Sequence, residues 1–336
     1  MTLAPMPEIR KDPVFGRWVI IASERGLRPN EFCPAAEGAV YVCPFCAGNE
    51  ALTPPTVYSL PDEKGAWRLR VVRNKYPALV PGGSAAARRD GIYDSMEGIG
   101  EHEVVIETPE HGRRLEDMPA AAIEDVIKTF ILRIREIKKD PLIKYVMIFK
   151  NHGRNAGATL LHPHSQIIAM PMAPLRVAQE IDGAAQYSRE RGTCVFCDIV
   201  KNEISFGKRV VAENSDFLAV TPYASRFSFE ACILPKRHFS HFEEMPDSGA
   251  AALAEVLKIT LGKLSSSLPD LSYNLIVHTT PVQDPAVAHY HWHIEIMPKL
   301  SQMAGFEWGT GFYINNVSPE DAAGILNAGK KYKVWP

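Results

Sequence analysis

The sequence predicts an α+β protein made of two copies of one unit, each a mostly antiparallel sheet with one main helix. The first observation is a constant offset, because the separation of His111 from His238 along the chain equals the separation of the Met-Pro dipeptides at Met118 and Met245. The second is that short strand-like runs surround one long amphipathic segment in each half. A duplication is the simplest explanation of such an offset, and antiparallel strands with few helices are typical of α+β proteins.

The helix of the first copy is expected over residues 119–139. Seven apolar residues recur there at the spacing of one helical face: Ile123, Val126, Ile127, Phe130, Ile131, Ile134 and Ile137. Asp117 precedes the segment as a candidate cap, and Asp140-Pro141 ends it, because proline does not continue a helix. Residues 246–268 predict the matching helix of the second copy.

Strands are expected where short apolar or alternating runs lie between turn-forming residues. In the first copy these runs are 18–22, 69–72, 104–107, 145–149 and 166–170, and in the second copy they are 217–220, 230–234, 274–278 and 291–297. We place the first domain at residues 1–186 and the second at 187–336, with the second copy beginning near Tyr187.

Composition narrows the possible classes of function. The chain has 336 residues, of which 46% are hydrophobic and 23% charged, and its net charge is −2. A near-neutral chain is not held to nucleic acid or to an anionic membrane by bulk charge. No stretch approaches the roughly 18 apolar residues that span a bilayer, and residues 1–11 lack the apolar core of a signal peptide. We therefore expect a cytoplasmic protein without nucleic-acid or membrane partners.

Two Cys-x-x-Cys pairs predict metal binding, since such pairs in a chain of cytosolic character are more often metal or redox sites than disulfides. Zinc prefers four cysteine and histidine ligands. Each copy offers such a set: Cys43, Cys46, His111 and His162 in the first, and Cys194, Cys197, His238 and His289 in the second. Core packing could explain each residue alone but not the repetition, so we predict two structural zinc ions. Cys33 and Cys232 receive no role.

A reactive histidine is predicted beside the first set. The run HPHSQ at residues 162–166 alternates, so His162, His164 and Gln166 share one face of a strand. A neutral imidazole attacks phosphorus well, and a nucleotidyl-histidine divides one difficult transfer into two easier steps. Residues 151–159 are rich in glycine, amide and other small side chains, so backbone N–H groups could approach a phosphate there. Gln166 could donate a hydrogen bond to the charge of the transition state.

These motifs resemble the galactose-1-phosphate uridylyltransferase family of the histidine-triad superfamily, whose signature is an HPHGQ run preceded by an Asn–Gly–Ser loop. The resemblance covers nearly the whole chain and implies a duplicated histidine-triad-like fold. It implies that His164 is the nucleophile and that Gln166 holds the transferred phosphoryl group. Six further residues match substrate-binding positions of the family: Arg25, Arg28, Asn74, Asn151, Gly157 and Thr159.

The activity that the resemblance implies first is UDP-glucose:hexose-1-phosphate (galactose-1-phosphate) uridylyltransferase. The substrates would then be a nucleoside-diphosphate sugar and a sugar 1-phosphate, and the protein, like the family, would be a homodimer.

Three departures from the family pattern keep the base and the acceptor open. Ser165 replaces the usual glycine. Uridylyltransferases often carry a second metal site of one glutamate and three histidines, whereas this chain has a second cysteine pair, which leaves Glu180 without a metal role. The sequence of residues 304–315 resembles the plant ADP-glucose phosphorylase branch more than the uridylyltransferases. It lacks the lysine and the glutamine that usually hold a hexose phosphate. ADP-glucose phosphorylase, with phosphate as the acceptor, is therefore the alternative.

The constant offset makes His291 the expected counterpart of His164 in the second copy. The loop before His291 is not suited to bind a phosphate, because Asp284 stands where the first copy has Gly157. An aspartate repels phosphate. We therefore predict structural or acceptor-site roles for His291 and His293.

Two rival functions remain open. The same histidine could serve a nucleotide hydrolase, with water as the acceptor. The chain could also be a zinc-stabilised binding module, although such modules keep their ligands within about 30 residues and carry basic helices. Here the ligands of each set are spread far more widely, from Cys43 to His162 and from Cys194 to His289. His102, His152 and His241 show no pattern and receive no role.

Overall fold

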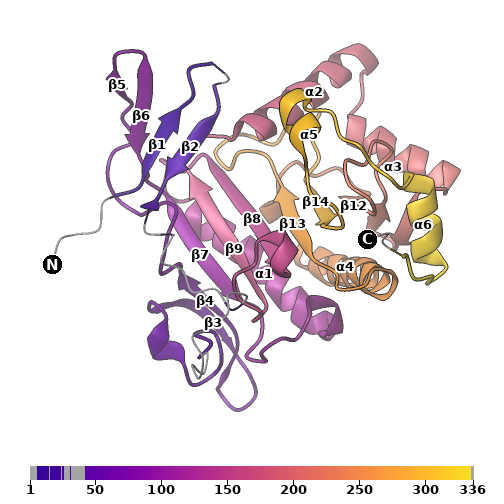
Figure 1. The fold of residues 1–336 in the computed structure, drawn as a ribbon, viewed down its shortest axis with the longest axis horizontal. Coiled ribbons are helices and arrows are strands. Elements are labelled where there is room, and N and C mark those ends of the chain that lie inside the picture. Colours follow the sequence, from indigo (N-terminus) through magenta and orange to yellow (C-terminus); the bar gives the residue numbers. More distant parts are fainter. Residues whose placement is uncertain (1–5, 15, 24, 26–30, 32–41, 334–336) are drawn as a thin grey trace.

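The computed structural model describes residues 6–14, 16–23, 25, 31 and 42–333. Its main element is an antiparallel ten-stranded sheet in the order β10-β11-β12-β14-β13-β8-β9-β7-β4-β3 (Figure 1). The strands are β3 (Thr56–Pro61), β4 (Trp67–Arg73), β7 (Glu101–Ile106), β8 (Tyr145–His152), β9 (His164–Met170), β10 (Val210–Glu213), β11 (Phe217–Val220), β12 (Ala231–Pro235), β13 (Tyr273–His278) and β14 (His293–Pro298).

The large sheet consists of two halves in matching order. β8 and β13 pair in the middle, with Asn151 opposite Asn274. Outward from this pair, β9, β7, β4 and β3 on one side correspond to β14, β12, β11 and β10 on the other. One long helix follows β7 and another follows β12. The predicted α+β class, the mostly antiparallel sheet and the duplicated fold are therefore confirmed.

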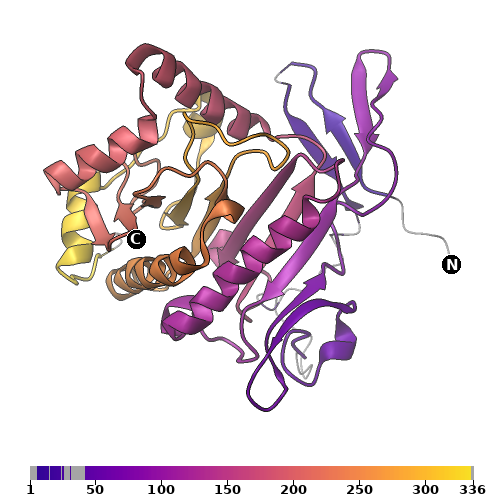
Figure 2. The same ribbon diagram turned by 180° about the vertical axis from the view of Figure 1, so that it is seen from behind.

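The two main helices lie side by side on one face of the sheet (Figure 2). They are α1 (Ala120–Ile137) and α4 (Asp247–Ser267), close to the predicted ranges. Their apolar faces join residues of both half-sheets in one core cluster, for example Ile127 and Leu261 with Ile167 of β9. Full burial of one such side chain is worth about 1.5–3 kcal/mol. Because strand side chains alternate, Ile167 faces the helices and His164 faces the opposite side of the sheet.

One close approach in the sheet requires glycine. Gly100, just before β7, has φ +149°, and a Cβ atom there would collide with the carbonyl oxygen of Ala169 in β9. Glycine has no Cβ and tolerates positive φ. The start of β7, which carries His102, can therefore pack directly against β9.

The remaining elements surround the sheet. A second sheet, β2-β1-β6-β5, stands beside the first half (Figure 1). It consists of β1 (Glu8–Lys11), β2 (Trp18–Ile21), β5 (Arg88–Asp90) and β6 (Tyr93–Glu97). The other helices are α2 (Leu175–Arg191), α3 (Val195–Phe206), α5 (Gly305–Thr310) and α6 (Pro319–Asn327), with short 3₁₀ turns η2 (Glu50–Leu52), η3 (Leu115–Asp117), η4 (Arg154–Ala156) and η5 (Phe242–Glu244).

Several of these elements were not predicted, notably β1, β3, β10, α2 and α3. Tyr187, where the second copy was expected to begin, lies within α2, so the two halves are joined through a helix. The domain limits 1–186 and 187–336 stay a prediction. Within the described part of the chain, none of the helices combines the length and the apolar character that crossing a membrane requires.

Candidate active site and metal clusters

The predicted nucleophile, His164, is held by the strand that carries it. Its Nδ1 lies 2.8 Å from the carbonyl oxygen of His162, so Nδ1–H donates to this oxygen and the lone pair of the neutral ring is on Nε2. The ring also packs edge-on against Phe45, with centroids 5.3 Å apart. The imidazole is therefore fixed in one tautomer and one orientation, with Nε2 as its nucleophilic atom.

The surroundings of His164 favour its neutral form. Burial is the largest effect and lowers the pKa of His164; the hydrogen bond to His162 and the charge of Glu107 oppose it, while the ammonium group of Lys150 adds to the lowering. An imidazole attacks phosphorus only when it is deprotonated. The lowered pKa therefore favours the neutral imidazole that the predicted role of His164 requires.

A buried ion pair lies on the other side of β9. Lys150 places Nζ 2.7 Å from Glu107 Oε2 and 3.3 Å from the carbonyl oxygen of His164. Ser165 donates from Oγ to Glu107 Oε1 at 2.5 Å. All three side chains are buried, so they link the backbone of the nucleophile to β7 and β8. Ser165, which stands where the HPHGQ signature has glycine, is thus part of a hydrogen-bonded support.

A cavity of about 250 Å³ lies in front of His164. Four predicted site residues line it: Asn74, Thr159, His164 and Gln166. The rest of the wall combines apolar side chains such as Phe45 and Leu160 with the cations Arg73 and Lys75, none of which was predicted. An apolar cleft with a few convergent polar groups is typical of a small-molecule site, and cations suit a phosphorylated ligand. Arg28 lies outside the described residues.

The other predicted binding residues do not line this cavity. Arg25 donates from Nη1 to the carbonyl oxygen of Tyr76 at 2.7 Å, so it supports the cavity wall from behind. Asn151 accepts a hydrogen bond from Nδ2 of Asn274 at 2.8 Å. Gly157 follows η4 with φ +82°, a left-handed conformation that favours glycine.

The first predicted metal set comes together in space. The ligand atoms of Cys43, Cys46, His111 and His162 all lie within 4.8 Å of one another. Cys46 Sγ is 3.5 Å from Nδ1 of His111 and 3.6 Å from Nδ1 of His162. His162 donates from Nε2 to the carbonyl oxygen of Thr108 at 2.7 Å, which leaves the Nδ1 lone pair toward the thiols. Metal-binding histidines are commonly oriented in this way.

The second set differs from the prediction in one residue. The residues that gather within 4.8 Å are Cys194, Cys197, His238 and His291. The predicted fourth ligand, His289, is not among them, and its carbonyl oxygen accepts from Cys194 Sγ at 3.4 Å. The prediction of His289 is therefore corrected to His291.

The cause is a change in offset along the second copy. The step along the chain from the start of β9 to the start of β14 is two residues longer than the step from the start of α1 to the start of α4. His291 therefore corresponds to the ligand His162, and His293, rather than His291, corresponds to His164. A shift of two residues leaves the same side chains on the same face of the strand, so the alternating pattern alone could not reveal it.

Both cysteine–histidine sets have the chemistry of a metal site. His238 and His291 donate from Nε2 to carbonyl oxygens at 3.0 and 2.9 Å, and their Nδ1 atoms lie 3.5 and 3.8 Å from Cys197 Sγ. Burial raises the pKa of Cys43 to about 12 and that of Cys197 to about 11, so a cation is needed to hold them as thiolates. Two thiolates and two neutral imidazoles make a closed, four-ligand structural site.

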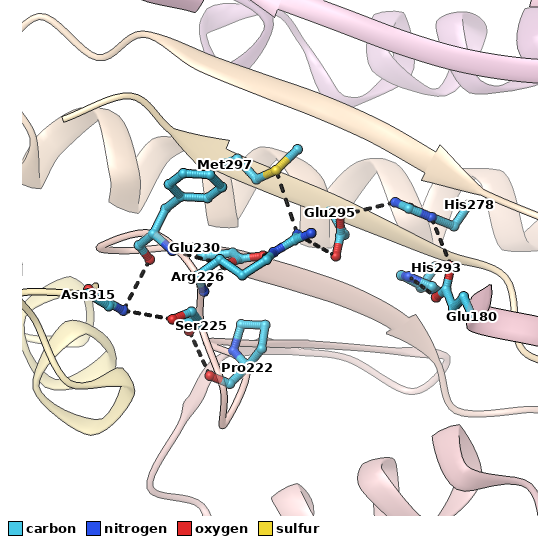
Figure 3. Close-up of polar contacts among 11 residues, drawn as sticks. Glu180, Pro222, Ser225, Arg226, Glu230, His278, His293, Glu295, Met297 and Asn315 are labelled. Atoms are coloured by element: carbon cyan, nitrogen blue, oxygen red, sulfur yellow. Dashed lines mark hydrogen bonds and ion pairs between the residues drawn. The ribbon is translucent and has the colours of Figure 1, made fainter. Parts of the chain in front are cut away.

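A third cluster lies where β13, β14 and α2 meet (Figure 3). Glu180, His278 and His293 have ligand atoms within 4.8 Å of one another. His278 Nδ1 is 3.2 Å from Glu180, and its Nε2 is 3.1 Å from Glu295. Arg226 binds Glu295 in turn, at 2.7 Å. The sequence alone does not indicate these partners of Glu180, because the helix α2 that carries it was not predicted.

The contacts of this third cluster are those of an ion-pair network. Burial alone would lower the pKa of His278, but its hydrogen bonds to Glu180 and Glu295 raise it to about 9. A doubly protonated imidazole has no lone pair for a metal. The family pattern of one glutamate and three histidines is also incomplete, because the described residues that gather here are one glutamate and two histidines, and the carboxylate of Glu295 binds the other side of His278. The residues as arranged therefore do not fit that metal site.

The chain matches known families along most of its length. The family model for the N-terminal domain of galactose-1-phosphate uridyl transferase matches residues 5–174, and a domain of unknown function, DUF4921, matches residues 121–328. An ADP-glucose phosphorylase of Arabidopsis thaliana is 38% identical over 95% of this chain and 92% of its own length. A galactose-1-phosphate uridylyltransferase of Thermotoga maritima is 32% identical over 95% of this chain and 97% of its own.

The fold agrees with these matches. The crystal structure of an ADP-glucose phosphorylase from Arabidopsis thaliana with bound ADP-glucose superposes with a TM-score of 0.77 at 38% identity, covering 96% of this chain and 98% of that one. With a family model over half of the sequence, and relatives at 38% and 32% identity along nearly all of it, the chain belongs to the galactose-1-phosphate uridylyltransferase family of nucleotidyltransferases.

Proposed function

We propose that this chain passes a nucleotide from a nucleoside-diphosphate sugar to a phosphorylated acceptor through a covalent bond to His164. The observation that carries the proposal is the geometry of that ring. Its Nδ1–H is engaged by the carbonyl oxygen of His162, which leaves the Nε2 lone pair as the nucleophile. The ring lines the same cavity as Gln166, an amide that can donate to a phosphoryl oxygen.

The transfer takes two steps. Nε2 of His164 attacks the α-phosphorus, the bond from that phosphorus to the bridging oxygen breaks, and the sugar 1-phosphate leaves with the electron pair. An oxygen of the acceptor phosphate then attacks the same phosphorus, and the P–N bond returns its electrons to Nε2. Charge grows on the phosphoryl oxygens in both steps, so a preorganised donor such as Gln166 accelerates both.

The first candidate for the reaction is UDP-glucose:galactose-1-phosphate uridylyl transfer. The name of the relative from Thermotoga maritima supports it. Family membership also favours transfer over the two rival expectations, hydrolysis and a zinc-stabilised binding module.

The second candidate is ADP-glucose phosphorolysis, which two observations favour. The relative from Arabidopsis thaliana, at 38% identity, carries that name. Residues 305–315 contain no cation, and their single charged side chain is the carboxylate of Glu307. A hexose monophosphate needs cationic or amide partners, whereas inorganic phosphate needs far less surface.

We propose zinc as the metal of both cysteine–histidine sets. The first set would hold the strand of His164 to the turn that carries Cys43 and Cys46. The second would hold the start of α3, where Cys194 is the N-cap and Cys197 lies in the first turn, to the segment just before β14 that carries His291. Because each set is closed, the ion would stabilise the fold and take no part in transfer.

We propose a homodimer as the working assembly. A cavity of about 870 Å³ is lined largely by apolar residues, including Trp18, Met170 and Met297, and Trp308 and Phe312 are each 72% exposed. Large exposed apolar surface commonly marks an interface between subunits. The cytoplasmic location also stays a prediction.

The decisive experiment loads the protein with one nucleotide at a time. After incubation with UDP-glucose or ADP-glucose and removal of small molecules, mass spectrometry of the peptide with His164 identifies the attached nucleotide. The loaded protein is then offered galactose 1-phosphate or inorganic phosphate. Release of UDP-galactose from uridylylated protein supports the first candidate, and discharge of adenylylated protein by phosphate alone supports the second. The absence of any adduct from either sugar nucleotide would contradict the covalent mechanism.

A further inference from the structure

A buried histidine outside the recognised motifs lies behind the active-site glutamine. His102 belongs to β7 and is only 2% exposed. In the register of β7 with β9, Gln166 is opposite Val104, so His102 is its diagonal neighbour on the same face, within side-chain reach. His102 Nε2 lies 2.9 Å from Gln166 Oε1.

The tautomer of His102 follows from its other nitrogen. The backbone N–H of Ala78 donates to His102 Nδ1 at 2.9 Å. A backbone N–H can only donate, so Nδ1 must present a lone pair to it. The proton of the neutral ring is therefore on Nε2, and Nε2–H donates to Gln166.

This donor determines which way the glutamine amide points. The two ends of a glutamine amide have nearly the same shape, and only hydrogen bonds distinguish them. Because Nε2–H of His102 requires an acceptor, Oε1 of Gln166 must face His102. The amide NH₂ is then the end that remains for the cavity, whose wall includes both Gln166 and His164.

The same histidine contacts two other candidate binding residues. Asn74 Nδ2 lies 3.1 Å from His102 Nε2, a contact between two donors and not a hydrogen bond, because Asn74 Oδ1 accepts from the N–H of Tyr76 at 2.9 Å. Arg25 Nη1 lies 3.4 Å from His102 Nδ1. The imidazole of His102 is therefore contacted by Arg25, by Asn74 just after β4 and by Gln166 of β9. It does not itself line the cavity.

We propose that His102 is a positioning residue that orients the amide of Gln166, so that its NH₂ and not its carbonyl faces the phosphoryl group transferred to His164. With the amide reversed, a carbonyl oxygen would face phosphoryl oxygens and repel them. This inference rests on the proposed function, since it assigns His102 a role in nucleotidyl transfer.

Two substitutions test the hydrogen bonds of the two ring nitrogens of His102 separately. In His102→Asn, the side-chain oxygen can take the place of Nδ1 and accept from Ala78, but no donor reaches Gln166. In His102→Gln, the amide nitrogen can take the place of Nε2 and donate to Gln166. His241→Asn is the matched control, because His241 is an equally buried histidine whose ring bonds to Ser240 and Pro281 in the second copy.

The rate of nucleotidyl-His164 formation in a single turnover is the measurement. Loss of one preorganised donor costs roughly 10²-fold, so Gln166→Ala should lose about that factor and His102→Asn about 10-fold or more. His102→Gln should recover a large part of the rate, and His241→Asn should keep it. Melting curves and metal content identify any variant that fails to fold.

The double variant His102→Asn with Gln166→Ala decides whether the histidine acts through the glutamine. Effects that act through one contact do not add, so the double variant should be no slower than Gln166→Ala by more than about 3-fold. Full multiplication of the two losses, or a folded His102→Asn protein with the wild-type rate, would overturn the inference. If the wild-type protein itself forms no adduct, the proposed function fails instead, so the two failures are distinguishable.

Discussion

Lys150 and Glu107 form an ion pair, 2.7 Å from Nζ to Oε2, directly beneath the strand that carries His164. Both side chains are buried, at 2% and 0% exposed, and the ammonium group also reaches the carbonyl oxygen of His164. A charge pair that has lost its water is held by mutual attraction and by the hydrogen bonds that satisfy its remaining atoms. The position of His164 therefore depends on a buried ion pair as well as on its own strand.

Removing one partner of this pair should be costly. Lys150→Met leaves the carboxylate of Glu107 buried without a cation, and such a loss typically costs about 3–5 kcal/mol. The double variant Lys150→Met with Glu107→Gln removes both charges and keeps an acceptor for Ser165, so it should recover most of that stability. Urea unfolding of the three proteins measures the free energies. A single variant that loses less than about 1 kcal/mol would show that the pair contributes little.

The two copies should differ completely in reactivity. His164→Ala and His164→Asn should abolish nucleotidyl transfer, whereas His293→Ala should leave the covalent adduct able to form, because His293 faces Glu180 at 3.1 Å and a carboxylate repels phosphate. Initial-rate kinetics should be ping-pong, with the sugar 1-phosphate released before the acceptor binds. Normal turnover by a His164 variant would refute the mechanism.

The pH profile of adduct formation should extend into the acid range. The reactive form of His164 is the deprotonated one, which predominates above its pKa, and burial together with Lys150 lowers that pKa from 6.5. The single-turnover rate should therefore fall with a midpoint below pH 6.5. Zinc content measured at each pH serves as the control for metal loss. A half-maximal rate at or above pH 6.5, with zinc retained, contradicts this expectation.

Metal analysis should find two zinc ions in each chain. Cys43→Ser should lose one ion and also lower the transfer rate, because the same site anchors the strand of His164. In the second copy, His291→Ala should lose one ion while His289→Ala keeps both, since only His291 joins that ligand set. Loss of zinc from His289→Ala and not from His291→Ala would show that His289 is the fourth ligand of the second set.

His278 should make part of the folding stability pH-dependent. Its pKa is raised in the folded state to about 9 from 6.5, so its contribution is fully present below about pH 6.5 and is lost as the pH rises through 9. The stability difference between the wild type and His278→Gln should therefore shrink between pH 6 and pH 10 in urea unfolding. A constant difference over that range would mean that the ring is not charged in the folded protein.

Sequence patterns predicted what depends on local periodicity. α1 and α4 follow from apolar spacing, and the alternation at 162–166 indicated that His162 and His164 share a strand face. The two cysteine pairs lie farther apart along the chain than the two helices do, so the repeat contains insertions. A further insertion of two residues before β14 makes His291, and not the predicted His289, the fourth ligand of the second set. Alternation has a period of two, so it cannot detect a shift of two.

Other features have no local signal at all. His102 carries no motif, and its role depends on how β7 and β9 align in the sheet. Glu107 and Lys150 are separated by α1, and only the pairing of β7 and β8 with β9 brings them together. Glu180 contacts His278 because α2 packs onto the second copy. Since α2 has few buried residues, its sequence lacks the apolar periodicity that would predict a helix. These contacts are products of tertiary structure.

The pairing of β8 with β13 gives the second copy a structural role in the sheet of the first. Without that copy, β8 would become an edge strand with a row of unpaired N–H and C=O groups along its eight residues. Such an open edge is a template for aggregation, and it would lie one strand away from His164. The second copy therefore covers the edge of β8 with a strand of the same chain, which removes that site of aggregation from the first half of the sheet.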